Sequence, residues 1–583
     1  MDYHLVTSLD IKTWHNHKCN IIIGDWNIGE NKFYRGFNYK ILSSNEILGN
    51  NLNRLVKKIN EIYSTISPLL YKKLNVYHNC DYSDRYWNII LGHWLYRCIS
   101  VFVYRFNVTE KVLSKYNITG ASIAVDKNNN LIAKNSLSFV YACEDQVWNS
   151  FLYGKIIEKI TDNNFLKSYI EVKSSKNFIY QTERKKSKFK NLINDLLFSK
   201  LPTLLYNETD ACIIDSYLSK VNELKLNILL KQLPRKYHFP EVNYNYSVNR
   251  SKFGKINIIS KDPIIKFFTE ILKDILPMSF VENYKDIDSM AKKLPFPKKP
   301  KFIFTSNAYD YNEIFKVWVA NKCEQGYKYI VGQHGNNYNT HLLFGNKILP
   351  ELSSTDGFFT WGWKNKSENI IQGFNFKSNK RRQIHNKKGG LLIICQPRED
   401  RWQPIDVETN FKKSLSDNKT LLDNLHDKIK KEVTLKYRVQ NTNFMKTNFF
   451  IKNFSNFKIE NHKFDLDVNL KKNRLVIFNY DSTGILELLC RNIPFIALLR
   501  NDLKYRKTHA NKMYQIMFDN KIFHHNAKSA SKFINNNWNT IEKWWYSSEV
   551  TKAKVSFSNN YSRSTSNTSK DLLFKIDKHL SNI

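Results

Sequence analysis

Short apolar runs alternate with helical stretches after residue 300. Residues 301–305 (KFIFT) and 327–332 (YKYIVG) predict buried strands, and the apolar spacing over 311–323 predicts a helix between them. A strand, a helix and a strand this close together form a βαβ unit, which implies parallel strands. A further short strand is predicted at 357–361 (GFFTW).

The same alternation begins again near residue 390. Strands are predicted at 390–395, 435–439, 474–478 and 494–499, and helices at 421–433 and 484–490. Two such series predict an α/β fold of two Rossmann-like, doubly wound domains that face each other across a cleft. Ligands bind beyond the carboxyl ends of parallel strands, so the residues after each strand are the candidates for a site.

The first 300 residues are more helical. A strand is predicted at 20–23, helices at about 45–74 and 87–106, and a polar, Lys-rich insertion at 161–200. The closing stretch at 527–546 predicts helices, whereas 556–569 is polar and predicts a loose segment. The expected domains are an N-terminal acceptor-side domain with helical insertions (1–378), a C-terminal donor-binding domain (388–550) and a polar tail (551–583).

One predicted helix, at 87–106, approaches the hydrophobicity of a membrane span. It carries His93, Arg97 and Arg105, which are costly inside a bilayer, so we predict a buried or groove-lining helix instead. The first residues lack the basic and apolar regions of a signal peptide. We therefore expect a cytoplasmic protein whose membrane contact, if it has any, is peripheral and on the inner face of the plasma membrane.

Composition adds a strong positive charge. The 583 residues include 90 Lys and Arg against 53 acidic residues, a formal charge of +37. Such a surface attracts nucleotide phosphates, lipid pyrophosphates or an anionic membrane, or it reflects a Lys-rich bias on solvated faces. The basic residues are dispersed and do not interleave with aromatics, which argues against nucleic acid as a partner. Eight separated cysteines without a CxxC argue against a zinc cluster or a disulfide framework.

The strand at 327–332 is followed by Gln333, His334 and Gly335, of which Gln333 and Gly335 are candidates for donor binding. A histidine on a glycine-flanked loop at a strand end can act as a general base toward an acceptor hydroxyl, or bind phosphate. The alternative is a histidine that only satisfies backbone groups in a turn. Position and the neighbouring amides favour a functional residue.

The strand at 474–478 is followed by Asp481, Ser482, Thr483 and Gly484, where a helix begins. Hydroxyls and unpaired N–H groups at a helix N-terminus form an anion site, which predicts a donor-phosphate site here. Glu487, one turn later, is placed to accept from ribose hydroxyls. The alternative is a plain cap by Asp481 or Ser482, with Glu487 on a solvated face.

Four further charged residues follow predicted strands or open helices. Arg398 and Arg438 are candidates for phosphate binding, or belong to solvated loops. Asp25 and Asp145 are candidate catalytic bases, with helix capping as the alternative for Asp25. No G-x-G-x-x-G motif or P-loop occurs, and the Asp-x-Asp at 465–467 does not clearly follow a strand, so a metal-independent enzyme is expected.

Several motifs, in order, resemble one family. The chain is similar over nearly its whole length to the transferases encoded in bacterial surface-polysaccharide and O-antigen gene clusters. The matching stretches are Gly24-Asp25-Trp26, RYWNIILGHWL from Arg85, DQVWNSFLYG from Asp145, IFTSNAY from Ile303, GQHGNNY from Gly332, TWGW from Thr360 and NYDSTGILELL from Asn479.

More distantly, the two halves look like the two-domain GT-B group, which includes Kdo transferases and teichoic-acid glycerophosphotransferases. The resemblance implies that His334 acts in catalysis and that Asp481, Ser482 and Thr483 hold the donor phosphate. The family loop is richer in glycine after the histidine, where this chain has Asn336, Asn337 and Asn339.

The resemblance implies a glycosyltransferase without a bound cofactor, which uses a nucleotide-sugar donor to extend a glycan or a lipid-linked glycan. A CMP-linked sugar (Kdo or a nonulosonic acid) is the first expectation and CDP-polyol transfer the second. Two other classes stay open, a non-catalytic glycan-binding scaffold and a nucleic-acid-binding protein. The enzyme hypothesis requires the loops at 333–335 and 481–483 to face each other.

Overall fold

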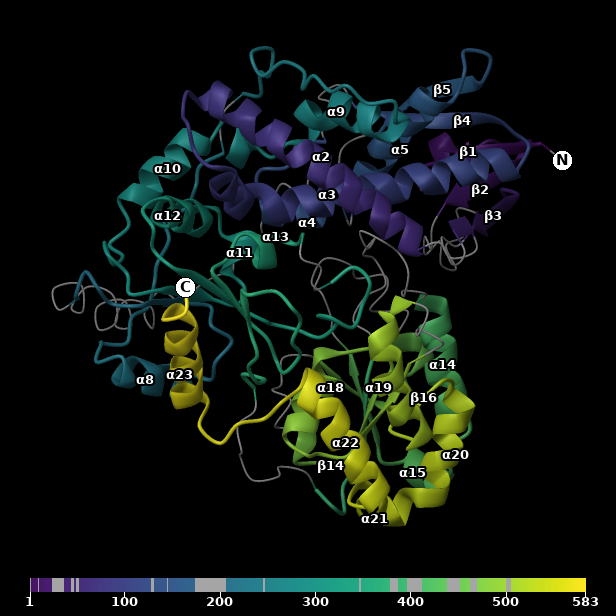
Figure 1. Ribbon diagram of the computed structural model, residues 1–583. Helices are drawn as coiled ribbons and strands as arrows, with labels where there is room; N and C mark the ends of the chain where they lie inside the picture. Colours follow the sequence, from purple (N-terminus) through teal and green to yellow (C-terminus); the bar gives the residue numbers. More distant parts are fainter. Residues whose placement is uncertain are drawn as a thin grey trace, which may run out of the picture.

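A computed structural model describes most of the chain. The described residues are 2–8, 10–23, 36–42, 47–48, 52–126, 131–143, 145–172, 206–244, 247–344, 348–377, 386–395, 411–437, 451–461, 469–499 and 505–583. They form three parallel sheets rather than the expected two (Figure 1). The α/β class with doubly wound, parallel sheets is confirmed, and the N-terminal half contains two of the three sheets.

The first sheet has the strand order β3-β2-β1-β4-β5 and is parallel throughout. Its strands are β1 (Tyr3–Val6), β2 (Cys19–Ile23), β3 (Tyr39–Leu42), β4 (Ile118–Val125) and β5 (Leu166–Glu171). Only β2 was predicted. The central strands carry polar positions inside the sheet, such as His4, whose Nε2 lies 2.8 Å from the Ser122 hydroxyl. These positions break the apolar pattern that predicts a buried strand.

The second sheet has the order β10-β9-β8-β7-β6. Its strands are β6 (Cys212–Ile214), β7 (Ile303–Thr305), β8 (Tyr329–Gly332), β9 (Gly357–Phe359) and β10 (Ile370–Ile371). The helix between β7 and β8 is α12 (Glu313–Glu324), preceded by the short α11 (Ala308–Tyr311). The predicted βαβ unit is therefore confirmed, and β8 delivers residues 333–335 to the carboxyl edge of the sheet.

The third sheet has the order β13-β12-β11-β14-β15-β16, the order of a six-stranded Rossmann sheet. Its strands are β11 (Gly390–Ile394), β12 (Val433–Tyr437), β13 (Lys458–Asn461), β14 (Asn473–Phe478), β15 (Phe495–Leu498) and β16 (Phe523–His524). The helix predicted at 421–433 is interrupted after Asp423, and of its second part only α15 (Asp427–Lys430) is helical. Helix α14 (Phe411–Asp423) ends earlier, and Val433 begins β12 because that segment pairs with β11 on one side and β13 on the other.

Two long helices, α2 (Leu52–His78) and α3 (Asp84–Lys115), lie between β3 and β4 in the chain and pack against each other (Figure 1). Helix α3 packs on α5 (Gln146–Ile160) beside the first sheet and on α12 beside the second. Its Arg105 is fully buried, and the Nε of Arg105 donates to Asn149 Oδ1 at 3.2 Å. The prediction of a buried helix is confirmed. Within the described ranges, none of the helices combines the length and the apolar character that a bilayer crossing needs.

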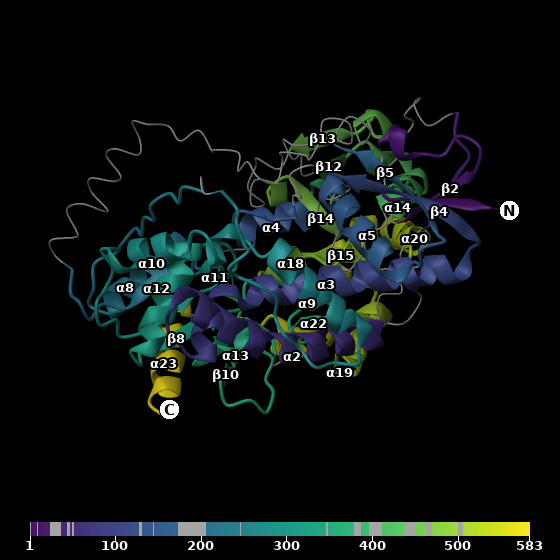
Figure 2. The ribbon, with the colours of Figure 1, turned by 90° about the horizontal axis from the view of Figure 1, so that it is seen from above.

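Shorter helices cover the sheets. In the N-terminal half these are α4 (Ser136–Cys143), α8 (Lys220–Leu229), α9 (Pro263–Ile275), α10 (Tyr284–Lys292) and α13 (Pro350–Ser353). In the C-terminal half they are α15 (Asp427–Lys430), α18 (Thr483–Cys490), α19 (Thr508–Asp519), α20 (Ala527–Asn537) and α21 (Ile541–Trp545). Figure 2 shows α8, α10 and α12 at one end of the molecule and the first-sheet strands β2 and β4 at the other.

The predicted polar tail at 551–583 is wrong. These residues contain most of α22 (Ser548–Tyr561) and all of α23 (Thr568–Leu580). Helix α23 returns to the N-terminal half, buries Leu572 and Ile576, and packs on α8 and β10 (Figure 1). The polar residues before it were misread because they cap and anchor helices: the Ser562 hydroxyl donates to the Leu486 carbonyl at 2.7 Å.

Candidate active site

The loop after β8 is fixed by the side chain of Gln333. Its Oε1 accepts from the Trp361 backbone N–H at 3.0 Å and from the Trp363 indole N–H at 2.8 Å. Its Nε2 donates to the Gly335 carbonyl at 2.8 Å. Both ends of the buried amide are therefore used to hold the loop against the residues that follow β9. This is a structural role for a residue that the sequence suggested as a donor ligand.

His334 lies among tyrosines. Its Nδ1 is 3.0 Å from the Tyr309 hydroxyl and 3.4 Å from the Tyr338 hydroxyl, and the two hydroxyls are 3.2 Å apart. The Tyr217 ring, from the loop after β6, meets the His334 ring edge-on at 6.0 Å. Burial lowers the pKa of His334, and only partial compensation comes from Asp310. The ring is therefore neutral at physiological pH and able to accept a proton.

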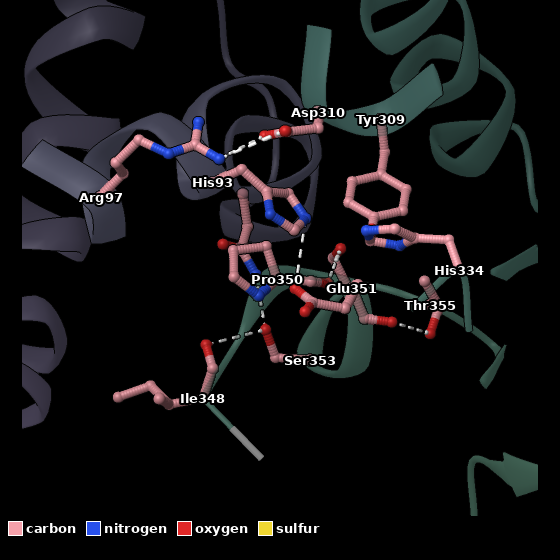
Figure 3. A network of polar contacts seen from close by, with 12 residues as sticks. His93, Arg97, Tyr309, Asp310, His334, Ile348, Pro350, Glu351, Ser353 and Thr355 are labelled. Atoms are coloured by element: carbon pink, nitrogen blue, oxygen red, sulfur yellow. Dashed lines mark hydrogen bonds and ion pairs between the residues drawn. The ribbon is translucent and has the colours of Figure 1, made fainter. Parts of the chain in front are cut away.

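Further buried polar groups, including His93 and Glu351, lie beside Tyr309 and His334 (Figure 3). Glu351, on α13, is 5% exposed, and its Oε2 lies 3.4 Å from Nε2 of His93 on α3. Burial raises the pKa of Glu351 to about 7 and lowers that of His93 to about 3. Of these two groups, only the carboxyl group therefore takes up a proton near neutral pH, and the imidazole is neutral.

Asp310 on α11 completes the cluster. NH2 of Arg97 on α3 donates to its two oxygens, at 3.0 and 3.2 Å (Figure 3). Burial alone raises the pKa of Asp310, but Arg97 and the nearby histidines outweigh it and bring the pKa to about 2. Asp310 is a permanent negative charge near His334 and does not cap α12. That cap is Asn312, which accepts from the Phe315 N–H at 3.0 Å.

The loop after β8 touches the N-terminus of α18 in the other half of the molecule. The Asn336 N–H donates to the Thr483 hydroxyl at 3.2 Å, and the Asn336 amide donates to Asp481 Oδ1 at 2.6 Å. A Cβ on Gly335 would lie 3.4 Å from the same Thr483 hydroxyl. The two loops that the sequence analysis required to face each other are therefore in contact.

Asp481 is a structural link between the halves. Its Oδ2 pairs with Arg506 and accepts from the Tyr514 hydroxyl at 3.1 Å, while its Oδ1 accepts from Asn336. Arg506 also stacks on the Tyr514 ring at 3.8 Å. Side chains of the protein thus bind both oxygens of the Asp481 carboxylate. The sequence had suggested Asp481 for donor binding, and the geometry assigns its oxygens to the contact between the halves.

The same contact extends along the backbone. His341 and Arg506 form an antiparallel bridge, the Leu342 N–H donates to the Tyr505 carbonyl at 3.0 Å, and the Lys507 N–H donates to the Thr340 carbonyl at 2.8 Å. Two asparagines let the loop turn here: Asn337 has φ 75° and Asn339 has φ 57°. Asparagine tolerates this left-handed conformation better than other non-glycine residues, so the loop can turn here without glycine.

The turn before α18 keeps its predicted features. Ser482 is the N-cap, and its hydroxyl accepts from the Gly484 N–H at 3.1 Å. A Cβ on Gly484 would come within 2.7 Å of the Phe478 ring, so only glycine fits between α18 and the end of β14. Glu487 lies one turn along α18, close enough to Tyr217 that its charge helps to raise the pKa of that phenol.

The remaining candidates lie elsewhere. Asp145 is the N-cap of α5 beside the first sheet, where its Oδ1 accepts from the N–H groups of Val147 and Trp148 at 2.9 and 3.0 Å. The contacts described for Asp145 are with its own helix and not with the His334 loop. Asp25, Arg398 and Arg438 lie outside the described residues.

The sequence analysis missed the partners of His334. Tyr309, Tyr338 and Glu351 come from a short helix, a loop and another short helix, and no local pattern brings them together. One signal was available on α3. His93 and Arg97, four residues apart on a mostly apolar helix, share a face, and this polar face is the one that meets the cluster.

The family comparison supports a transferase, and the solved structures are only distantly similar. A family model described as "LIC12162 family transferase" matches residues 3–576. No curated protein matches the chain. Among solved structures, one described as a putative UDP-N-acetylglucosamine 2-epimerase from Listeria monocytogenes aligns over 64% of this chain and 88% of its own, with 9% identity and a TM-score of 0.35. MurG of Acinetobacter baumannii aligns over 51% of this chain and 77% of its own, with 11% identity and a TM-score of 0.29. The wall teichoic acid polymerase TagF with CDPG aligns over 49% and 74%, with 11% identity and a TM-score of 0.29.

Proposed function

The chain belongs to the LIC12162 family of transferases, and we propose that it transfers a sugar from a nucleotide donor to a glycan acceptor. One observation carries the proposal. A neutral, partly buried histidine at the end of β8 lies on a loop that touches the N-terminus of α18, as the Asn336 N–H donates to the Thr483 hydroxyl at 3.2 Å. A base and an anion site are the two elements that such a reaction needs.

In the proposed reaction, His334 takes the proton of an acceptor hydroxyl. The hydroxyl oxygen attacks the anomeric carbon of the donor sugar and forms the new glycosidic bond. The bond between that carbon and the phosphate oxygen breaks, and its electron pair leaves with the nucleotide. The proton is then on His334, and the negative charge is on the nucleotide phosphate.

The N-terminus of α18 is suited to that charge. The first N–H groups of a helix carry partial positive charge, and the Ser482 and Thr483 hydroxyls lie beside them. Lys377 adds a cation on the same side, because its Nζ lies 5.1 Å from the centre of the Tyr217 ring, which in turn contacts His334. Binding of the donor phosphate at this helix is part of the proposal.

For the donor, we favour a CMP-linked 3-deoxy acid sugar, because the chain resembles transferases of surface-polysaccharide gene clusters, an association that suggests a nucleotide-activated sugar. The histidine loop and the Ser-Thr turn resemble those of teichoic-acid glycerophosphotransferases. Transfer of a polyol phosphate from a CDP-polyol would use the same two loops. It differs in the atom attacked, since the acceptor oxygen would bond to phosphorus. Presenting a CMP-sugar and a CDP-polyol in parallel, with analysis of the glycan product, separates the two reactions.

The direct test is a thermal-shift screen with CMP, CDP, UDP and GDP on the wild type and on two capping variants. A nucleotide at 100 times its Kd stabilises the folded state by about 2.7 kcal/mol. Ser482→Ala and Ser219→Ala each remove an N-cap, the second on α8, and each costs about 1 kcal/mol. We expect the wild type and Ser219→Ala to respond to one nucleotide, and Ser482→Ala to respond weakly. A chain that responds to none of the four has no donor site of the proposed kind.

A further inference from the structure

The two nitrogens of the His334 ring are not equivalent. Among the described residues, the hydrogen bonds of this ring are made at Nδ1, to Tyr309 at 3.0 Å and to Tyr338 at 3.4 Å. A neutral imidazole carries one proton, and the nitrogen without it is the base. If Tyr309 donates to Nδ1, the proton is on Nε2, which then cannot act as a base. If Nδ1 donates to Tyr309, Nε2 is the base.

The direction of these hydrogen bonds depends on Glu351, which lies at the other end of the series His334, Tyr309, Tyr338. The Tyr309 hydroxyl is 3.2 Å from that of Tyr338, and the Tyr338 hydroxyl faces the Glu351 carboxyl group, whose pKa it helps to lower. An ionised carboxylate only accepts. Tyr338 must then donate to Glu351, which leaves its oxygen to accept from Tyr309. The Tyr309 oxygen in turn accepts from Nδ1 of His334.

We propose that Glu351, Tyr338 and Tyr309 are positioning residues that keep the proton of His334 on Nδ1 and so leave Nε2 as the base. The inference rests on the proposed function for the use of that base. In this scheme, the Glu351 carboxylate selects the tautomer of His334 through Tyr338 and Tyr309. None of the three touches the reacting atoms in this scheme.

The hydrogen bonds between Glu351, the two tyrosines and His334 can reverse their direction when Glu351 takes up a proton. A carboxylic acid donates to Tyr338, and each bond in the chain then points the other way, with Tyr309 donating to Nδ1. The pKa of Glu351, raised to about 7 by burial, places this reversal near neutral pH. The groups that face Glu351 are His93 and Arg97 of α3, Asp310 and Tyr309 of α11, Tyr63 of α2, Tyr329 of β8 and Tyr338.

The test is the tautomer of His334, measured by NMR on protein with ¹⁵N-labelled histidine and without any ligand. The signal is assigned with His334→Gln. At pH 8 we expect the proton on Nδ1 in the wild type and on Nε2 in Tyr338→Phe, where Tyr309 has only His334 to donate to. Tyr63→Phe is the matched control, because Tyr63 faces Glu351 but is hydrogen-bonded to Asn88 and Tyr71 instead.

A second measurement uses pH and does not depend on the folding of Tyr338→Phe. Lowering the pH from 8 to 6 should move the His334 proton toward Nε2 in the wild type but not in Glu351→Gln. A wild-type proton on Nε2 at pH 8, or the same tautomer in Tyr338→Phe and the wild type, overturns the inference. Nucleotide binding plays no part in either measurement, so a failure of the proposed function is seen separately in the thermal-shift screen.

A different observation concerns helix α8, which exposes its apolar side. Val221, Leu224 and Ile228 lie within one arc of the helix and are 52%, 47% and 64% exposed. The opposite side of the helix buries Leu226 and two asparagines against the protein, one of them Asn222, whose carbonyl accepts from Ser569 of α23. An apolar strip that faces outward on a folded helix is typical of an interaction site.

Charge indicates the partner. Lys220 and Lys225 border the strip and Lys231 follows the helix, and all three are exposed. The acidic residue of α8, Glu223, is on the other side, where it accepts from the Ser216 hydroxyl at 2.6 Å. A second copy of a chain with a formal charge of +37 would be repelled. We infer that α8 docks on an anionic lipid surface, with its strip in the headgroup region and its lysines on the lipid charges.

The test is co-sedimentation of the whole chain with phosphatidylglycerol vesicles, with phosphatidylcholine vesicles as the neutral comparison. The double variant Leu224→Ser/Ile228→Ser should lose at least ten-fold in affinity. Ile259→Ser, which changes a fully exposed isoleucine in a loop, should bind like the wild type. Equal binding by the double variant overturns the inference. So does a wild-type dimer in sedimentation velocity that the double variant abolishes, since the strip would then serve a second copy.

Discussion

The two sides of the candidate site are built on different physical principles. On the N-terminal side, His334 is surrounded by buried titratable groups whose pKa values are shifted by burial, among them Glu351 and His93. On the C-terminal side, Ser482 and Gly484 form a fixed helix start whose N–H groups do not titrate. The first side should respond to pH and to the loss of a single proton-carrying group. The second should respond to changes in shape.

The largest effect should come from the proton-accepting side. His334→Ala removes the proposed base, so transfer should fall by about 10²- to 10⁴-fold while nucleotide binding stays unchanged. The measurement is the rate of transfer at saturating donor, together with the nucleotide-dependent shift in Tm. His17→Ala, at an exposed histidine beside the first sheet, is the control and should behave like the wild type. Equal loss of nucleotide binding would mean that the two sides are not separable.

The link between the sides should be the most sensitive point for stability. In the Arg506–Asp481 pair the side chains are 1% and 4% exposed. Arg506→Met leaves a buried carboxylate without its cation, which should lower the free energy of unfolding by about 3–5 kcal/mol. The comparison is Lys159→Met, which breaks an exposed pair with Glu270 and should cost about 0.5 kcal/mol or less. Urea unfolding followed by circular dichroism measures both, and similar losses would contradict the buried link.

Glu351 offers a test in which function and stability favour different protonation states. The ionised form orients His334 in the proposed scheme, whereas the protonated form gives the more stable fold. Folding raises its pKa from 4.5 to about 7, so the folded state binds the proton more tightly than the unfolded state. The resulting stability is present below pH 4.5 and is lost as the pH rises to 7, about 3 kcal/mol in all. Glu351→Gln keeps the shape of the protonated acid and carries no charge. It should be as stable as the wild type at pH 5 and more stable at pH 8.

Chemical unfolding at the two pH values measures this difference. Ser482→Ala, on the other side of the site, should lose about 1 kcal/mol at both, because a helix cap does not titrate in this range. A Glu351→Gln variant that is less stable than the wild type at pH 8 would show that the carboxylate stabilises the fold, which would contradict the raised pKa of Glu351.

The two sides also differ in how far the sequence predicted them. The end of β8 and the turn into α18 were predicted because each is a local pattern: an apolar run followed by glycine, or by serine and threonine. The chain from His334 to Glu351 was not, since its members are brought together by the packing of α11 and α13 on α3. Asp481 shows the same limit. Its position at a helix start was correct, but its partner Arg506 depends on tertiary structure.

The first sheet was missed for a related reason. Strand β4 (ITGASIAV) contains Gly120 and Ser122, and β1 (YHLV) contains His4, so neither has the apolar run that predicts a buried strand. In the folded chain, His4 and Ser122 satisfy each other across the β1–β4 pair. Long-range pairing of polar groups cannot be seen in a single segment, whereas the strands of the third sheet are apolar enough to be recognised one by one.

The smallest expected effect concerns the loop that joins the two sides. Asn339 has φ 57°, a conformation that costs an ordinary residue about 1 kcal/mol and glycine nothing. Asn339→Ala should therefore lower the free energy of unfolding by about 1 kcal/mol, and Asn339→Gly should change it by a few tenths, since its backbone carbonyl still accepts from His509. If the loop conformation orders both sides of the site together, Asn339→Ala should weaken nucleotide binding and slow transfer by the same factor. Asn339→Gly should leave nucleotide binding and transfer unchanged. A loss of transfer alone would show that the loop serves the base, and that the helix start holds the donor without it.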